Sequence, residues 1–298
     1  MEELDKVKNQ IKLFVKSCKD SKSLELLELL PQGKMLRSKL ILKIAGETTE
    51  SIKLCAIVEM IHAASLLHDD VIDDATTRRG KPSINALFGN KTAIMFGDIL
   101  YSKAFSELSL MDKNIAHTVA NAVTLLSIGE MLDVELTQEF NTSYEKYHDM
   151  IYKKTASLIE ASAKSAAILA QKDKDAFALY GRNLGLAFQM IDDILDITQD
   201  SETLGKPAML DFVEGKVTIP YLLLYKKTEQ KDKLKSLYKK ELSADEQKWI
   251  KDEMIKYGIL VESISMAQKL GMEAIEAIKD DENEELKNIM SQMINREF

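Results

Sequence analysis

Two copies of the pattern Asp-Asp-x-x-Asp, at 69–73 and 192–196, hold the side chains most able to do chemistry. Each copy lies in an apolar stretch with helical periodicity, so its first and last aspartates, four residues apart, share one helix face. Like charges at this spacing cost an exposed helix roughly 0.2–0.5 kcal/mol per pair. A cation between the carboxylates offsets that repulsion, and Mg²⁺ prefers hard oxygen ligands. The pattern therefore favours two magnesium-binding clusters.

A solvated acidic face is the competing explanation, and a single cluster would not decide between the two. Two copies, each followed by a loop that contains Lys, Arg or Gly, at 75–85 and 199–218, favour ligand binding. A calcium-binding EF-hand does not fit, because its loop needs ligands at alternate positions, a central glycine and a final glutamate.

Basic side chains flank both clusters, and they are Lys34, Arg37, Arg78, Arg79, Lys81, Lys206 and Lys216. A diphosphate needs such partners, since arginine offers a planar fork of donors and lysine a compact charge. Lys34 and Arg37 are three residues apart and can point the same way from the start of a helix. Each basic pair alone is typical of a solvated surface, but beside the aspartates the set indicates a diphosphate site.

Helices must bring these groups together. Glycine (12) and proline (4), which interrupt helices, are scarce among the 298 residues. Apolar residues recur at helical spacing nearly throughout, and no alternating strand pattern of useful length competes. We therefore predict an all-α chain that forms one domain, residues 1–298, without linker or repeat. Ser243 followed by Glu246 predicts a capping box at the start of a late helix.

Charge and cysteine content exclude several classes of protein. A net charge of −8 and a pI of about 5.3 argue against a nucleic-acid partner. Cys18 and Cys55 lie in apolar helical patterns, which predicts buried thiols in a reducing compartment. The N-terminus lacks a signal-peptide pattern, and no apolar run approaches the roughly 20 residues of a membrane span. We expect a cytoplasmic protein without a transmembrane segment.

These segments resemble the trans-isoprenyl (polyprenyl) diphosphate synthase family, and within it the octaprenyl-type long-chain synthases, over roughly residues 30–225. Beyond the two clusters, the resemblance rests on short motifs: Gly33-Lys34-x-Leu36-Arg37, His62 seven residues before Asp69, Arg78-Arg79-Gly80, Gly97-Asp98, Gly129-Glu130-x-x-Asp133, Lys154-Thr155, Phe188-Gln189, Asp211, and Gly215-Lys216-x-Thr218-x-Pro220. Taken alone, a histidine on an apolar helix, such as His62, is more often a core residue than a ligand.

The resemblance implies the isoprenoid synthase fold, an orthogonal bundle of about ten or more helices around a central cavity, with the two clusters facing each other across its mouth. It also implies the reaction. Isopentenyl diphosphate would condense with an allylic diphosphate, head to tail and in the trans geometry, through a Mg²⁺-assisted carbocation. Three Mg²⁺ ions would be present with substrate bound. Their ligands would be Asp69, Asp73 and Asp192, supported by Asp70, Asp193 and Asp196.

The family also implies a role for the other polar residues. The allylic diphosphate would be held by Arg78, Lys154 and Lys206, and Lys216 is a further substrate-binding residue. Isopentenyl diphosphate would be held by Lys34, Arg37, His62 and Arg79. Thr155 and Gln189 would bind substrate and place oxygen dipoles near the carbocation. The catalytic set is then Asp69, Asp70, Asp73, Lys154, Thr155, Gln189, Asp192 and Asp193.

Ala64 and Ser65, one helical turn before the first cluster, bear on the length of the product. Family enzymes that stop at C15 often place an aromatic ring there, whereas small residues would leave the path of the growing chain open. We therefore expect a product longer than C15, in the C30–C40 range. The alternative is that these small residues only allow close helix packing.

The resemblance further implies a homodimer, with the apolar helices near 92–137 as the candidate interface, and transient membrane contact during product release.

Three other functions stay open. A terpene cyclase shares the fold and the first cluster, but it would not need Lys34, Arg37 and Arg79. A metal-dependent phosphohydrolase would use His68-Asp69, yet the chain has only four histidines. A helical scaffold protein would explain neither cluster.

Overall fold

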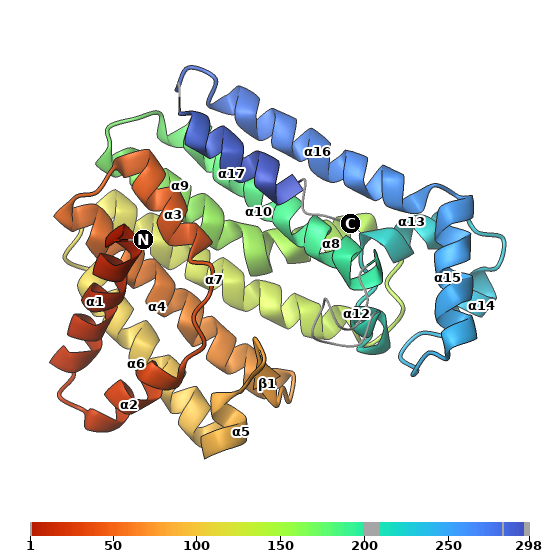
Figure 1. Cartoon of the computed structure of the whole chain (residues 1–298), viewed down its shortest axis with the longest axis horizontal. Coiled ribbons are helices and arrows are strands. Elements are labelled where there is room, and N and C mark those ends of the chain that lie inside the picture. Colours follow the sequence, from red (N-terminus) through yellow and green to blue (C-terminus); the bar gives the residue numbers. More distant parts are fainter. Residues whose placement is uncertain (1, 199–208, 282, 295–298) are drawn as a thin grey trace. The chain divides into compact units, whose positions relative to one another are not determined.

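The computed structural model describes residues 2–198, 209–281 and 283–294, and nearly all regular structure in these ranges is helical (Figure 1). The all-α prediction is thus confirmed. The chain divides into two compact units. The first contains the residues up to Val123 together with Ala161–Ala178, and the second contains Thr124–Glu160 together with the residues from Leu179 onward. A single domain remains a prediction.

The first unit is built on long apolar helices and one short hairpin. Its elements are α1 (Glu2–Ser17), α2 (Ser21–Leu29), α3 (Leu36–Ala45), α4 (Thr49–Ile72), β1 (Thr77–Arg78), β2 (Lys81–Pro82), α5 (Ile84–Phe88) and α6 (Asn90–Leu108). Helix α4 packs against α1, α3 and α6. It begins with a capping box between Thr48 and Ser51 and is buried along most of its length. This helix ends in the first aspartate cluster.

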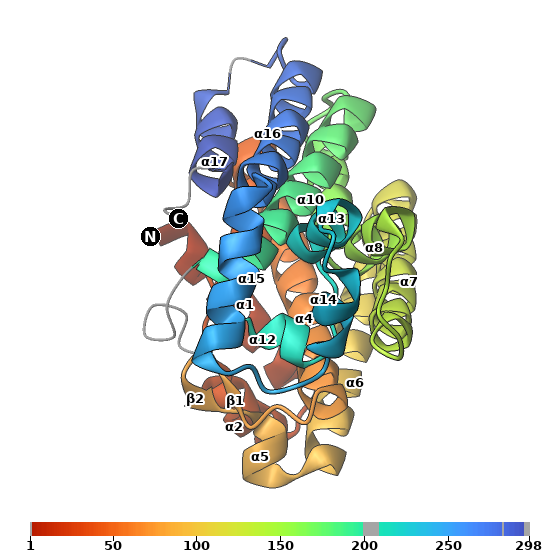
Figure 2. The same cartoon turned by 90° about the vertical axis from the view of Figure 1, so that its right-hand side faces the viewer.

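Three further helices, α7 (Lys113–Leu136), α9 (Ser157–Leu169) and α10 (Lys174–Thr198), contribute residues to both units. The elements wholly in the second unit are α8 (Tyr144–Ile151), the π-helix η1 (Tyr152–Ala156), α12 (Leu210–Val213), α13 (Ile219–Lys227), α14 (Lys231–Ser236), α15 (Ala244–Lys256), α16 (Ile259–Ala277) and α17 (Glu284–Ile294). Helices α14 and α15 lie side by side (Figure 2), with Lys233 4.1 Å from the centre of the Trp249 ring.

Aromatic stacking joins the short helix α12 to α13. Phe212 of α12 stacks on Tyr221 of α13 with ring centroids 4.2 Å apart, and both rings are fully buried. The predicted capping box is confirmed at the start of α15, where Ser243 Oγ accepts from the Glu246 amide and Glu246 accepts from the Ser243 amide. The described residues from Met209 to the start of α13 are anchored by the stacking of Phe212 on Tyr221.

The cysteine prediction was half right. Both thiols are free, and Cys55 is buried as expected. Cys18 is exposed instead, because α1 ends at Ser17 and Cys18 lies in the turn that follows the helix.

Two helices come closer to the composition of a membrane span than inspection of the sequence suggested. By length and composition alone, α4 and α7 could cross a membrane, and 61% and 39% of their most apolar windows are buried within the protein. A core helix of a globular protein meets the same criterion, so this observation is weak evidence for a span. The absence of a transmembrane segment stays a prediction.

Candidate active site

The first aspartate cluster lies at the C-terminal end of α4. One of its carboxylates is buried and paired with an arginine, and the others are more exposed. Asp70 is buried, and its Oδ1 accepts hydrogen bonds from Arg78 Nε at 2.6 Å and Nη2 at 2.5 Å. Asp69 is partly exposed and Asp73 is exposed, one turn further on. Arg78 is thereby anchored on the hairpin by Asp70, while Asp69 and Asp73 share the face that can take a metal ion.

The loop after this cluster is folded back on α4. Asn85 Nδ2 donates to the carbonyl oxygens of Asp70 at 3.0 Å and Ala75 at 2.9 Å. The hairpin turn is Arg79-Gly80, and both residues have positive φ, at 53° and 72°, as a tight two-residue turn requires. Asn85 was not among the predicted site residues, although an asparagine that closes a loop is a recognisable signal.

A cluster of positive charge lies in the same unit. Arg79 Nη1 donates to the carbonyl oxygen of Pro31, and a Cβ on Gly33 would lie 2.6 Å from that nitrogen, so a larger residue at position 33 would displace the guanidinium. Arg37 Nε is buried and has no hydrogen-bond partner among the described residues. Burial, together with Arg37, Arg79 and Arg78, holds the pKa of His62 well below its usual value. A neutral imidazole beside several guanidinium groups fits an anion site.

The remaining predicted residues of this unit are placed as follows. Lys34 is exposed immediately before α3. Ala64 and Ser65 are buried on α4, and Ser65 Oγ donates to the His62 carbonyl oxygen at 2.9 Å, which satisfies its polar group. His68 contacts α6, with its Nε2 3.2 Å from the Ile94 carbonyl oxygen and 3.4 Å from Asp98 Oδ1. This use of His68 as a packing residue weakens the phosphohydrolase alternative.

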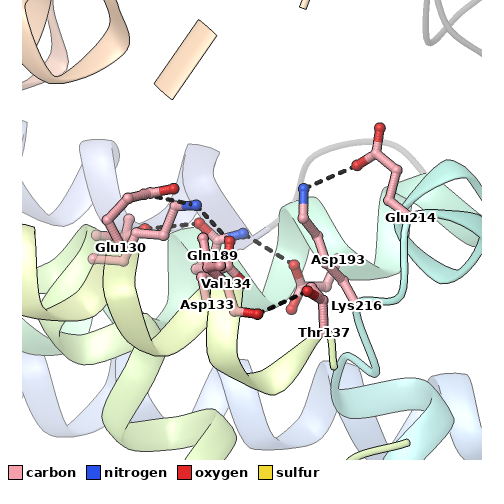
Figure 3. A network of polar contacts seen from close by, with 10 residues as sticks. Glu130, Asp133, Val134, Thr137, Gln189, Asp193, Glu214 and Lys216 are labelled. Carbon is pink, nitrogen blue, oxygen red and sulfur yellow. Dashed lines mark hydrogen bonds and ion pairs between the residues drawn. The ribbon is translucent and has the colours of Figure 1, made fainter. Parts of the chain in front are cut away.

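In the second unit, Lys154 is held by two buried carboxylates of α7. Its Nζ lies 2.5 Å from Asp133 Oδ2 and 2.9 Å from Glu130 Oε2. Figure 3 labels both acidic residues on α7. Burial lowers the pKa of Lys154, but Asp133 and Glu130 outweigh it and raise the pKa above its usual value. The ammonium group is therefore charged at neutral pH and fixed in position. The two acidic residues were recognised as a motif but were given no role.

Lys154 and Thr155 lie in the π-helix η1, and two glycines let neighbouring helices approach its backbone. A Cβ on Gly129 of α7 would lie 2.2 Å from the Lys154 backbone nitrogen, and one on Gly185 of α10 would lie 2.5 Å from Ala156 Cα. π-Helical turns are rare and are often found at functional sites. No sequence signal identified this turn.

Hydrogen bonds connect η1 and α8 to the second aspartate cluster on α10. Thr155 Oγ1 donates to Gln189 Oε1 at 2.9 Å, and Gln189 Nε2 donates to Asp193 Oδ1 at 3.0 Å. Tyr147 of α8 donates to the other oxygen of Asp193 at 2.5 Å. Burial, followed by the charge of Asp211, raises the pKa of Asp193 well above its usual value. Asp193 is thus occupied by protein donors, much as Asp70 is in the first cluster.

The other residues of the second cluster lie towards the loop before α13. Asp192 is partly exposed, and buried Asp196 accepts from the Asp211 amide at 3.3 Å. Lys216 pairs with Glu214 at 2.9 Å; burial lowers its pKa, but Asp133, Asp211 and Glu214 raise it above its usual value. Lys206 lies outside the described residues.

The donor set fits Mg²⁺ that shares its coordination with a substrate. Among the described residues, no group of three His, Cys, Asp or Glu side chains could hold a metal ion on its own. Mg²⁺ commonly takes one or two carboxylates, several waters and substrate phosphates, so Asp69, Asp73 and Asp192 suit it as carboxylate ligands.

Comparison with known proteins agrees with these motifs. The polyprenyl synthetase family model matches residues 24–255. The chain belongs to this family. An octaprenyl pyrophosphate synthase from Helicobacter pylori is 48% identical, with a TM-score of 0.94 over 99% of both chains. A polyprenyl synthase from Caulobacter crescentus, complexed with calcium and isoprenyl diphosphate, is 30% identical, with a TM-score of 0.88 over 99% of this chain and 95% of that one.

Curated family members match over shorter segments. A short chain isoprenyl diphosphate synthase from Methanothermobacter thermautotrophicus is 38% identical over 213 residues, which is 67% of this chain and 66% of that protein. The matched segments cover 41% to 66% of the curated relatives' own lengths. The resemblance found in the motifs and the all-α isoprenoid synthase fold are both confirmed, and the family uses divalent metal ions.

Proposed function

We propose that the protein is a trans-polyprenyl diphosphate synthase, a transferase that condenses isopentenyl diphosphate head to tail with an allylic diphosphate. The observation that carries the proposal is that both Asp-Asp-x-x-Asp motifs are intact in a chain 48% identical to an octaprenyl pyrophosphate synthase, with 99% of both chains matched. In each motif the second aspartate is held by protein donors, and the first stays partly exposed.

The residues of each unit suggest how the steps are divided. Lys154, Lys206, Lys216 and Arg78 would bind the allylic diphosphate. Asp69, Asp73 and Asp192 would hold Mg²⁺, with three ions present when substrate is bound. These ions would act as Lewis acids and neutralise the leaving diphosphate. Breaking the allylic C–O bond leaves a carbocation, and the oxygens of Thr155 and Gln189 would stabilise its charge.

The first unit would present the second substrate. Lys34, Arg37, His62 and Arg79 would hold isopentenyl diphosphate. The buried Arg37 Nε, which has no hydrogen-bond partner in the described part of the chain, supports an anion there. The double bond of isopentenyl diphosphate attacks the cation, which forms the new C–C bond. Loss of a proton then restores the double bond, and the released diphosphate is the proposed base.

We also propose a homodimer in the cytoplasm, with transient membrane contact when product leaves. Exposed apolar side chains on α7 support the homodimer. Ile128, Met131 and Val134 recur every three residues, and 39%, 73% and 42% of their surfaces are exposed. Such a stripe on one helix face is typical of a subunit interface.

Incorporation of labelled isopentenyl diphosphate into an extractable product, with and without Mg²⁺, tests the proposal. We expect incorporation that stops with a chelator and returns with added Mg²⁺. Conversion of an allylic diphosphate to a hydrocarbon without use of isopentenyl diphosphate would indicate a cyclase. Phosphate release from a nucleotide would indicate a phosphohydrolase, and no Mg²⁺-dependent thermal stabilisation by diphosphate would indicate a scaffold protein.

Chain length gives a sharper prediction. If the product grows past the small side chains of Ala64 and Ser65, Ala64→Phe should shorten the longest product, because an aromatic ring would block its path. Ala63→Phe is the matched control, since the adjacent residue points about 100° away around the helix. Product sizing by chromatography measures both variants. An unchanged product from Ala64→Phe, or equal shortening by both, would show that this face does not line the path.

A further inference from the structure

Tyr147 has no assigned role, yet it is the first member of a buried chain of hydrogen bonds that ends in the proposed site. Its side chain is 1% exposed, and its hydroxyl donates to Asp193 Oδ2. Asp193 Oδ1 accepts from Gln189, whose own carbonyl oxygen accepts from Thr155. Figure 3 shows the Gln189 and Asp193 part of this chain on α10. Both oxygens of Asp193 are therefore used within the protein.

The π-helix explains how the segment from Tyr147 to Thr155 supplies the residues at both ends of this series of hydrogen bonds. Tyr147 and Thr155 are eight residues apart, whereas two turns of a regular α-helix take roughly 7.2 residues. A π-turn adds about one residue, so residues eight apart return to the same face. That face meets Asp193 and Gln189, which are four apart on one face of α10. The unusual turn thus aligns the hydroxyls of Tyr147 and Thr155 with their two partners.

We propose that Tyr147 is a positioning residue for the second aspartate cluster: by fixing the carboxylate of Asp193, it sets the orientation of Asp192 for metal and of Gln189 for substrate. The inference rests on the proposed function. Asp193 follows Asp192 directly on α10, and Gln189 lies one turn before it. A carboxylate held from both sides cannot rotate, so the amide of Gln189 keeps its donor on Asp193 and its carbonyl oxygen on Thr155.

Tyr147→Phe tests this inference, because it keeps the buried ring and removes only the hydroxyl. Residues that hydrogen-bond directly to a metal ligand typically change metal affinity by about 10–100-fold, and Tyr147 acts one residue further out, so the lower end of this range applies. We expect the Mg²⁺ concentration for half-maximal activity to rise about tenfold, with a smaller fall in kcat at saturating Mg²⁺. A second readout needs no turnover: the Mg²⁺ concentration for half of the thermal stabilisation given by inorganic diphosphate should rise by a similar factor.

Tyr152→Phe is the matched control, since it also removes a tyrosine hydroxyl from the same segment. The Tyr152 ring lies 5.3 Å from the guanidinium carbon of Arg182, away from the chain of hydrogen bonds. Its Mg²⁺ dependence should match the wild type. Asp193→Ala supplies the second comparison. If Tyr147 acts through Asp193, adding Tyr147→Phe to that variant should change its Mg²⁺ dependence no further.

Three outcomes would overturn the inference. The first is a Mg²⁺ dependence of Tyr147→Phe equal to that of Tyr152→Phe, which would make the hydroxyl an ordinary core group. The second is that Tyr147→Phe raises the Mg²⁺ concentration for half-maximal activity by the same factor with and without Asp193→Ala, which would show that Tyr147 does not act through Asp193. The third is a wild-type protein with neither Mg²⁺-dependent diphosphate binding nor incorporation, which would refute the proposed function as well.

Discussion

Lys154→Met is expected to lower both stability and activity severely. The lysine neutralises Glu130 and Asp133, whose side chains are only 9% and 8% exposed and which lie three residues apart on α7. Removing one member of a buried ion group leaves uncompensated charge and typically costs 3–5 kcal/mol. We expect about 3 kcal/mol, because Lys154 is 23% exposed. Activity should fall at least about 100-fold through the loss of a diphosphate ligand. Chemical denaturation and steady-state kinetics measure the two effects.

The pH dependence of the stability loss separates charge from packing. The raised pKa of Lys154 means that its contribution is complete below the unfolded-state pKa, about 10.4, and is lost only as pH rises through the folded-state value. The stability deficit of Lys154→Met should therefore stay constant from pH 7 to about 10 and shrink as pH rises further. A deficit that does not change above about pH 10 would contradict the electrostatic explanation.

Lys153→Met is the control for this variant. The neighbouring lysine pairs with Asp149 at 2.6 Å, but half of the Asp149 side chain is exposed. An exposed pair of this type contributes at most about 0.5 kcal/mol. Lys153→Met should therefore unfold like the wild type and keep its activity. If both variants lost equal stability, the triad of Lys154, Glu130 and Asp133 would have no special role.

Gly129→Ala is expected to have the second largest effect. The added Cβ would lie 2.2 Å from the Lys154 backbone nitrogen, and a backbone atom cannot rotate away as a side chain can. Overpacking costs roughly 1–3 kcal/mol or more, and the higher helix propensity of alanine returns at most about 1 kcal/mol. We expect a net loss of about 2 kcal/mol. Displacement of Lys154 by about 1 Å should lower kcat/KM by roughly 100-fold.

Gly271→Ala provides the comparison for Gly129→Ala. Gly271 is also a buried helical glycine, and its added Cβ would lie 2.1 Å from Ile294 Cδ1, the end of a flexible side chain. The isoleucine can change rotamer, and alanine favours the helix, so we expect a stability close to the wild type. Thermal unfolding compares the two. Equal stabilities, with full activity of Gly129→Ala, would show that close approach of α7 and η1 is not required.

The sequence identified the all-α class and both aspartate clusters because those features are local. Helical periodicity and the scarcity of glycine and proline act within single segments, and Asp-Asp-x-x-Asp spans little more than one helical turn. The exposure of Cys18 was missed because a pattern of apolar residues does not show where a helix ends.

Long-range partners explain what the sequence could not supply. Asp70 and Asp193 were assigned supporting roles by resemblance, but their donors, Arg78 and Tyr147, become visible only when the chain is folded. The same holds for Gly129. A glycine is needed there because the backbone of Lys154, 25 residues further along the chain, comes so close to it. A π-helix has no recognisable composition, so the alignment of Tyr147 with Thr155 could not be predicted either.

Elongation of farnesyl diphosphate tests the central claim most directly. Purified protein would be incubated with Mg²⁺, labelled isopentenyl diphosphate and farnesyl diphosphate, and the dephosphorylated products would be sized by chromatography. We predict a ladder that ends at C30 or beyond, which requires repeated condensation at one site and an open path beside Ala64. No incorporation of isopentenyl diphosphate with farnesyl diphosphate or with any shorter allylic primer would contradict the account.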